Sequence, residues 1–171
     1  MKSLNHLGSV PLTWVQPKAF RREFELQAAE ETVARIQWET AFGSLVSVQT
    51  SEGRWLIKRF GLFWRQGSIS REGEAGDPAT FHFGWFGRAR LDTQRGDHYF
   101  WRRSGFWLPT WTFTNSSGFP VARFRLSGFF LKSKGEIEVC ESAQLHLPDL
   151  PLLMLIGWYL VLVIQRRSRR R

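Results

Sequence analysis

The side chains best suited to acid–base chemistry are two histidines that lie close to carboxylates. His98 directly follows Asp97, and His146 lies three residues before Asp149. A histidine beside a carboxylate can act as a general acid or base. However, a hairpin turn and a helix cap explain Asp97 and Asp149 equally well. The four histidines of the chain also lack the spacing of metal ligands. The sequence therefore predicts neither a catalytic pair nor a bound metal.

Cys140 is the one thiol in the chain, so it cannot form an intramolecular disulfide. It ends a strand-like segment, 136–140, where we expect a small packed residue rather than a nucleophile. The glycine-rich segment 84–89 lacks the third glycine and the following helix of a dinucleotide-binding loop. The sequence contains no phosphate-binding loop or nucleophile elbow. We therefore predict a protein that is not an enzyme and needs no cofactor.

Basic residues that follow apolar strand cores are the remaining candidates for a site. We predict that some gather at one rim of the fold, where arginine can hold lipid headgroup oxyanions through bidentate hydrogen bonds. The residues assigned to this anionic-ligand site are Lys58, Arg59, Arg102, Arg103, Arg123 and Arg125. A wider set with the same pattern contains Arg65, Arg88, Arg90, Lys132 and Lys134. The alternative is that all of them are ordinary solvated strand positions.

The expected partner is an anionic phospholipid or membrane surface rather than a nucleic acid. The net charge is +9, but five arginines lie in the last seven residues, so the rest of the chain is only mildly basic. Nucleic acid would need exposed aromatic rings on which bases stack. The rings nearest the basic residues fall instead on strand faces that a core would claim: Trp38, Phe83, Trp101 and Trp111.

Alternating apolar and polar residues predict the strands that must position these side chains. Period-two alternation, which is typical of strands with one buried face, occurs in segments 32–39, 80–85, 98–102, 110–114 and 120–126. Polar clusters containing glycine separate the segments at roughly the ~8–12-residue spacing of all-β folds. Nine tryptophans and fifteen phenylalanines also favour strands. At 171 residues the chain fits a single, mainly β domain.

Segment 150–164 is apolar all round, and we predict a helix buried in the core. Asp149 and Pro151 provide an N-cap and a first turn, whereas the run is shorter than the ~20 residues that cross a bilayer. Gly157 would allow one close approach to the surrounding wall. The predicted core residues of this helix are Leu152, Leu153, Leu155, Ile156, Trp158, Tyr159, Leu160 and Leu162. The alternative is a single-span membrane protein, with a soluble β domain anchored by this helix.

Together, the hairpins and the apolar C-terminal segment resemble the tubby C-terminal-like superfamily, which includes the phospholipid scramblases and the LURP-one-related proteins. The resemblance lies in SEGRWLIKR (51–59), SSGFPVARF (116–124) and the closing LPLLMLIGWYLVLVI (150–164), and it covers roughly residues 10–165. It implies an antiparallel closed β-barrel around the helix, acting as a non-enzymatic binding module. The lone cysteine excludes a scramblase-like palmitoylation cluster, so scrambling activity is not implied.

These expectations divide the chain into an N-terminal tail, 1–11, one domain, 12–165, and an arginine-rich tail, 166–171. The first residues lack the apolar run of a signal peptide. We therefore expect a cytoplasmic protein peripheral to the membrane, with a membrane-anchored protein as the alternative.

Overall fold

The computed structural model describes residues 11–17, 22–39, 44–61, 65–84, 87–105, 109–127, 134–140 and 147–168. Twelve strands lie within these ranges and a helix follows them. The strands are β1 (Leu12–Val15), β2 (Glu23–Ala28), β3 (Glu31–Trp38), β4 (Leu45–Thr50), β5 (Gly53–Phe60), β6 (Gln66–Arg71), β7 (Ala79–Phe83), β8 (Ala89–Thr93), β9 (His98–Ser104), β10 (Thr110–Asn115), β11 (Pro120–Ser127) and β12 (Lys134–Val139).

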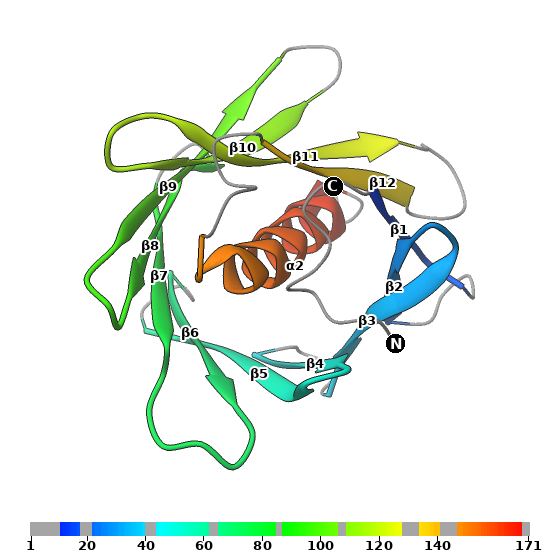
Figure 1. The fold of residues 1–171 in the computed structure, drawn as a ribbon, viewed down its shortest axis with the longest axis horizontal. Helices are drawn as coiled ribbons and strands as arrows, with labels where there is room; N and C mark the ends of the chain where they lie inside the picture. The colour runs from blue at the N-terminus through cyan, green and yellow to red at the C-terminus, as the bar shows by residue number, and fades with distance from the viewer. Residues whose placement is uncertain are drawn as a thin grey trace.

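The described strands form one closed antiparallel barrel, as predicted. Each strand pairs with the next one along the chain, and β1 pairs with β12 to close the ring, with Leu12 opposite Ile137. Figure 1 looks into this ring and shows that it surrounds the helix. Closure leaves no unpaired sheet edge, which removes a common route to aggregation.

The predicted alternation is confirmed in strands from both halves of the chain. In β3, Ile36 and Trp38 are buried whereas Arg35 and Gln37 are exposed. In β10, Trp111 and Phe113 are buried and the threonines beside them are less so. Strand β7 ends at Phe83, so the predicted segment 80–85 is cut short, and Trp85 lies outside the described residues.

Helix α2 (Leu150–Ser168) lies inside the barrel. Every residue from Leu152 to Val163 is buried, which includes all eight predicted core residues. The side chains on all faces of this helix therefore contact the barrel wall. The helix also extends beyond the predicted end at residue 164, since it includes Arg166 and Arg167. Among the described residues, no helix combines the length and the hydropathy that a bilayer crossing requires.

Asp149 fixes the start of α2 to the wall. Its carbonyl accepts a hydrogen bond from the Leu153 amide at 2.9 Å. Its buried carboxylate accepts one from the Tyr99 hydroxyl of β9 at 3.2 Å. Burial raises the pKa of the Asp149 carboxyl, although the Tyr99 hydrogen bond opposes this shift. The predicted cap position is therefore confirmed, and its side chain connects helix to strand.

Large rings pack directly over inward-facing glycines. A Cβ atom added to Gly157 of α2 would lie 2.2 Å from the Phe124 ring, so this glycine permits the expected close approach of the helix to β11. The Phe124 ring also packs on Trp101, with centroids 5.1 Å apart. On the wall, Trp14 covers its cross-strand partner Gly135 in the same way. An aromatic ring over a glycine fills the space that a side chain would otherwise occupy.

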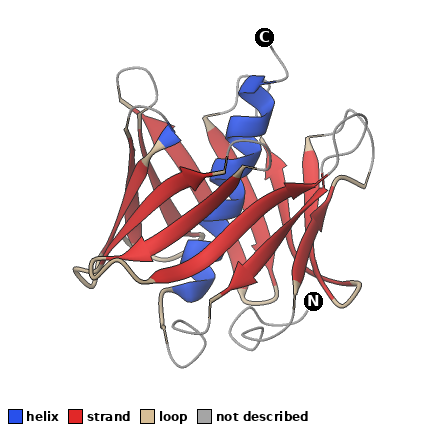
Figure 2. Cartoon of the chain, turned by 90° about the horizontal axis from the view of Figure 1, so that it is seen from above, coloured by secondary structure: helices blue, strands red, loops and turns tan. Residues whose placement is uncertain are grey.

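The barrel has two distinct ends. At one, the strands are joined by five turns, at 29–30, 51–52, 72–78, 94–97 and 116–119, and the Asp149–Tyr99 contact places the start of α2 there. At the other lie the ends of β3, β5, β7 and β9, and Trp38 packs there against Tyr159 with ring centroids 6.3 Å apart. We call them the turn end and the helix-exit end. Figure 2 shows the helix running from one to the other.

Candidate functional site

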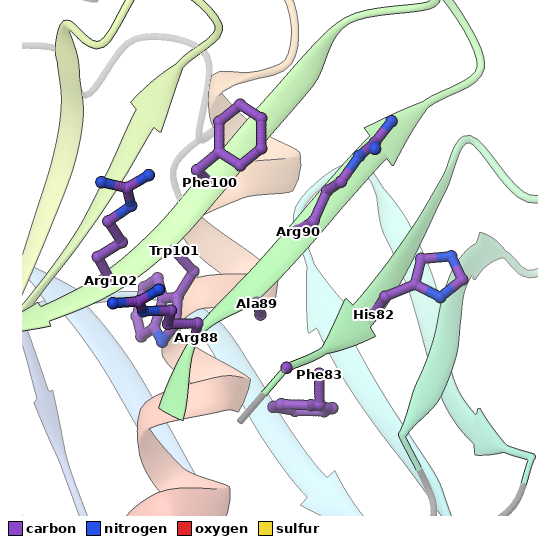
Figure 3. Close-up of a pocket in the computed structure, with 9 residues that line it drawn as sticks. His82, Phe83, Arg88, Ala89, Arg90, Phe100, Trp101 and Arg102 are labelled. Atoms are coloured by element: carbon purple, nitrogen blue, oxygen red, sulfur yellow. The ribbon is translucent and has the colours of Figure 1, made fainter. Parts of the chain in front are cut away.

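A groove of about 300 Å³ lies across β7, β8 and β9 near the helix-exit end. It is lined by residues 82–84, 88–90 and 100–102. Figure 3 shows the Arg88, Arg90 and Arg102 side chains at β8 and β9, and the Phe83 and Phe100 rings on different strands and well apart. Phe100 is partly exposed on the outer face, whereas Phe83 lies on the inner face in register with the buried Ala89 and Trp101. The groove therefore combines one partly exposed aromatic ring with cationic side chains.

Strand register explains why this groove exists. Phe83 pairs with Ala89, and Ala89 pairs with Trp101. One residue further along, this register sets Gly84 opposite Arg88 and Arg88 opposite Arg102. The Gly84 amide confirms the first of these pairs, because it donates to the Arg88 carbonyl at 2.8 Å. Since Gly84 has no side chain, the outer surface beside Arg88 is hollow.

Arg88 and Arg102 provide the available positive charge of the groove. Both are exposed, and neither makes an ion pair with a carboxylate in the part of the chain that the structure describes. Like charges directly opposite each other on neighbouring strands destabilise a sheet. An anion bound between the two guanidinium groups would reverse that repulsion.

Arg90 is held in a separate polar network on the same outer face. Its guanidinium contacts the Asp92 carboxylate at 2.6 Å, and His98 Nδ1 lies 2.7 Å from the same oxygen. Partial burial acts to raise the pKa of Asp92. The hydrogen bonds from Arg90 and His98 outweigh it, so the pKa lies below its usual value. Because its guanidinium is bound to Asp92, Arg90 contributes mainly the aliphatic part of its side chain to the groove.

The structure does not gather the six predicted site residues into one patch. Lys58 is exposed on the outer face of β5, and three strands separate it from β9 in the ring. Arg59 pairs with Gly67, whose missing Cβ faces the buried Phe81 ring, so Arg59 lies on the inner face. Adjacent residues on a strand point to opposite faces, so Lys58 and Arg59 cannot both belong to one surface site.

The same separation applies to the second predicted pair, on β9. Arg102 lies on the outer face and lines the groove, whereas Arg103 pairs with the buried Trp111 and is exposed at the helix-exit end. On β11, Arg123 and Arg125 both bind the Glu138 carboxylate, at 3.0 and 3.1 Å. Such exposed ion pairs contribute little stability, but they reduce the net charge at these positions.

Within the described residues, the structure does not form the pair of His98 and Asp97 that was considered for catalysis. His98 contacts Asp92 rather than Asp97. His146, with Lys132, lies outside the described residues. Cys140 is buried, and burial raises the pKa of its thiol, which disfavours the reactive thiolate. No cluster of potential metal ligands occurs within the described ranges.

Sequence reasoning missed the groove as a unit, although Arg88 and Arg102 were both noted. The signal that could have found it is the turn at 94–97, whose hairpin pairs Thr93 with Asp97 through a hydrogen bond of 2.9 Å. Counting back evenly from that pair sets Arg88 opposite Arg102. The hollow that Gly84 leaves beside Arg88 can be predicted only when the register is extended from β8 to β7.

No protein-family model, curated protein or solved structure matches this chain. The conclusions on function below therefore rest on the residues and the fold.

Proposed function

We propose that this protein is a non-enzymatic binding module that attaches to anionic membrane surfaces through its helix-exit end. The observation that carries the proposal is the position of the cations that lack a carboxylate partner among the described residues. Most of them lie towards that end of the barrel: Lys58, Arg88, Arg102, Arg103 and Lys134. Arg95, in the turn 94–97, lies at the turn end. The closed barrel around an apolar C-terminal helix also supports membership of the tubby-like superfamily.

Acidic residues gather at the opposite end of the molecule. Exposed carboxylates of the turns and their flanks include Glu30, Glu74, Asp77 and Asp97. The barrel therefore has a charge asymmetry along its axis, with the positive side at the helix-exit end. In the field of an anionic membrane, such a molecule is oriented with that end towards the lipid.

Phe60 provides an apolar contact at the same end. It is the last residue of β5, its side chain is 46% exposed, and Lys58 lies two residues before it on the same face. An aromatic ring flanked by a cation suits the headgroup region, where the ring meets the acyl boundary and the charge meets phosphate. Each basic residue near an anionic surface contributes about 1 kcal/mol, which salt weakens.

Vesicle flotation tests this proposal. We expect the protein to float with phosphatidylserine-containing vesicles and not with neutral ones, and to be released by salt. Replacing Arg102 and Arg103 by Ala removes two unpaired cations and should weaken binding about 30-fold.

The matched control is the double substitution of Arg123 and Arg125 by Ala. It removes the same number of charges from a neighbouring strand, but both already bind Glu138. We expect a reduction of only a few-fold. Equal losses in the two double variants would show that net charge alone governs binding. Equal flotation with neutral and anionic vesicles would refute the proposal.

A further inference from the structure

We propose that the groove across β7, β8 and β9 binds a small organic anion: an oxyanion held between Arg88 and Arg102, with an apolar body on Phe100. This site lies on the side wall of the barrel and would take a freely diffusing molecule. The proposal does not rest on attachment to membranes, and each can fail without the other.

The positive charges of the groove favour an anionic ligand. Arg88 and Arg102 are set opposite each other by the register and line the same groove, and neither has a carboxylate partner in the described ranges. Arg90, the third arginine of the groove, is already bound to Asp92. A carboxylate or phosphate can accept hydrogen bonds from two guanidinium groups at once, and such charge-assisted bonds are stronger than neutral ones.

The aromatic surface of the groove favours a ligand that also carries an apolar group. The ring of Phe100 is partly exposed on the outer face that carries Arg88 and Arg102, and the buried Trp101 and Ala89 lie on the inner face of the same wall. An inorganic anion would leave the exposed aromatic surface hydrated, whereas an apolar group on the ligand would remove that surface from water. Low-polarity surroundings also strengthen the contact between the oxyanion and the arginines.

The volume restricts the size of the ligand. At about 300 Å³ the groove is at the lower limit of small-molecule sites, which run from about 300 to 1,000 Å³. It is open because Gly84 has no side chain. A Cβ at this position would meet only ordinary contacts, with the Arg88 carbonyl at 3.5 Å and its Cβ at 3.6 Å. Any residue is therefore sterically possible there, and a large one would fill the groove.

The experiment measures binding of octanoate, below its micellar concentration, by isothermal titration calorimetry and by amide chemical shifts. Octanol, octyl phosphate and inorganic phosphate are the comparison ligands. We expect octanoate or octyl phosphate to bind at least about tenfold more tightly than octanol and than inorganic phosphate, with shifts centred on Gly84 and Arg88. The better of the two acids identifies the oxyanion.

Two groove variants and a control locate the site. Arg88→Gln should weaken binding of the acid at least about tenfold without affecting binding of octanol. Gly84→Leu, which changes no charge, should abolish binding of the acid. Arg123→Gln, on β11, should leave it unchanged. Near-UV circular dichroism checks that each variant is folded.

Three results would overturn the proposal. Equal binding of octanol and octanoate would remove the role of the arginines, and equal binding of inorganic phosphate would remove that of the Phe100 ring. Unchanged octanoate binding in folded Arg88→Gln or Gly84→Leu protein would place the ligand elsewhere.

Discussion

Replacing Gly157 by Ala tests directly whether α2 packs inside the barrel. The added Cβ would lie 2.2 Å from Cζ of Phe124 and 2.7 Å from two further atoms of the same ring. The ring cannot easily move, because Trp101 and Phe113 pack against it with centroids 5.1 and 6.2 Å away. Overpacking of this kind costs up to about 3 kcal/mol, while replacing a helical glycine by alanine regains about 1 kcal/mol. We therefore expect a net loss of about 2 kcal/mol.

Chemical denaturation and thermal unfolding would measure this loss. A change of about 2 kcal/mol should lower the Tm by about 4–8 °C in a chain of this length. Phe124→Leu removes the ring atoms that clash, so the double variant should be at least about 1 kcal/mol more stable than the sum of the single effects. Gly157→Ala protein as stable as the parent, or strictly additive effects, would refute the packing of this helix against β11.

Two further predictions concern the whole of the same helix and the residue before its first turn. A chain that ends at Pro148 lacks helix α2, which fills the interior of the barrel. Each buried side chain of this helix contributes about 1.5–3 kcal/mol, so their sum exceeds the usual protein stability of about 5–15 kcal/mol. We expect this chain to aggregate without detergent while the full chain stays soluble, and a soluble, folded truncated domain would contradict the core role. Asp149→Asn should be more stable than the parent at pH 7.5, and the difference should vanish towards pH 4, as followed by Tm. Burial holds the pKa of Asp149 in the folded protein above its value in the unfolded chain. As pH rises between these two pKa values, the ionising carboxyl increasingly destabilises the fold. Asn still accepts the Tyr99 hydrogen bond, and a loss of stability that grows as pH rises would show that the carboxylate charge itself stabilises the fold.

Local patterns in the sequence predicted the barrel and its core helix because each depends on neighbouring residues. Alternation needs only a few consecutive positions, as in β3, where Ile36 and Trp38 are buried and Gln37 is not. The helix needs one apolar run between a cap and charged residues. Its end was placed four residues early because the apolar run stops at Ile164, whereas arginine continues a helix readily.

The candidate site was less predictable because it depends on register between strands. Nothing near Arg123 in the sequence shows that Glu138 lies opposite it, and this pairing decides whether its charge is available. The distance between Lys58 and Arg102 likewise depends on the number and order of the strands between them. A shift of one residue in any ladder would turn the arginines of the groove to the inner face.

The position of α2 after every strand of the wall determines when the barrel can be completed. Synthesis proceeds from the N-terminus at about 5–20 residues per second, so all twelve described strands leave the ribosome before the helix does. Hairpins between consecutive strands are local and can form early, but closure must bring Leu12 beside Ile137. Until α2 arrives, rings such as Trp101 and Phe124 have no helix to pack against. Assembly of this interior therefore cannot be completed until every strand of the wall and then the helix have been synthesised.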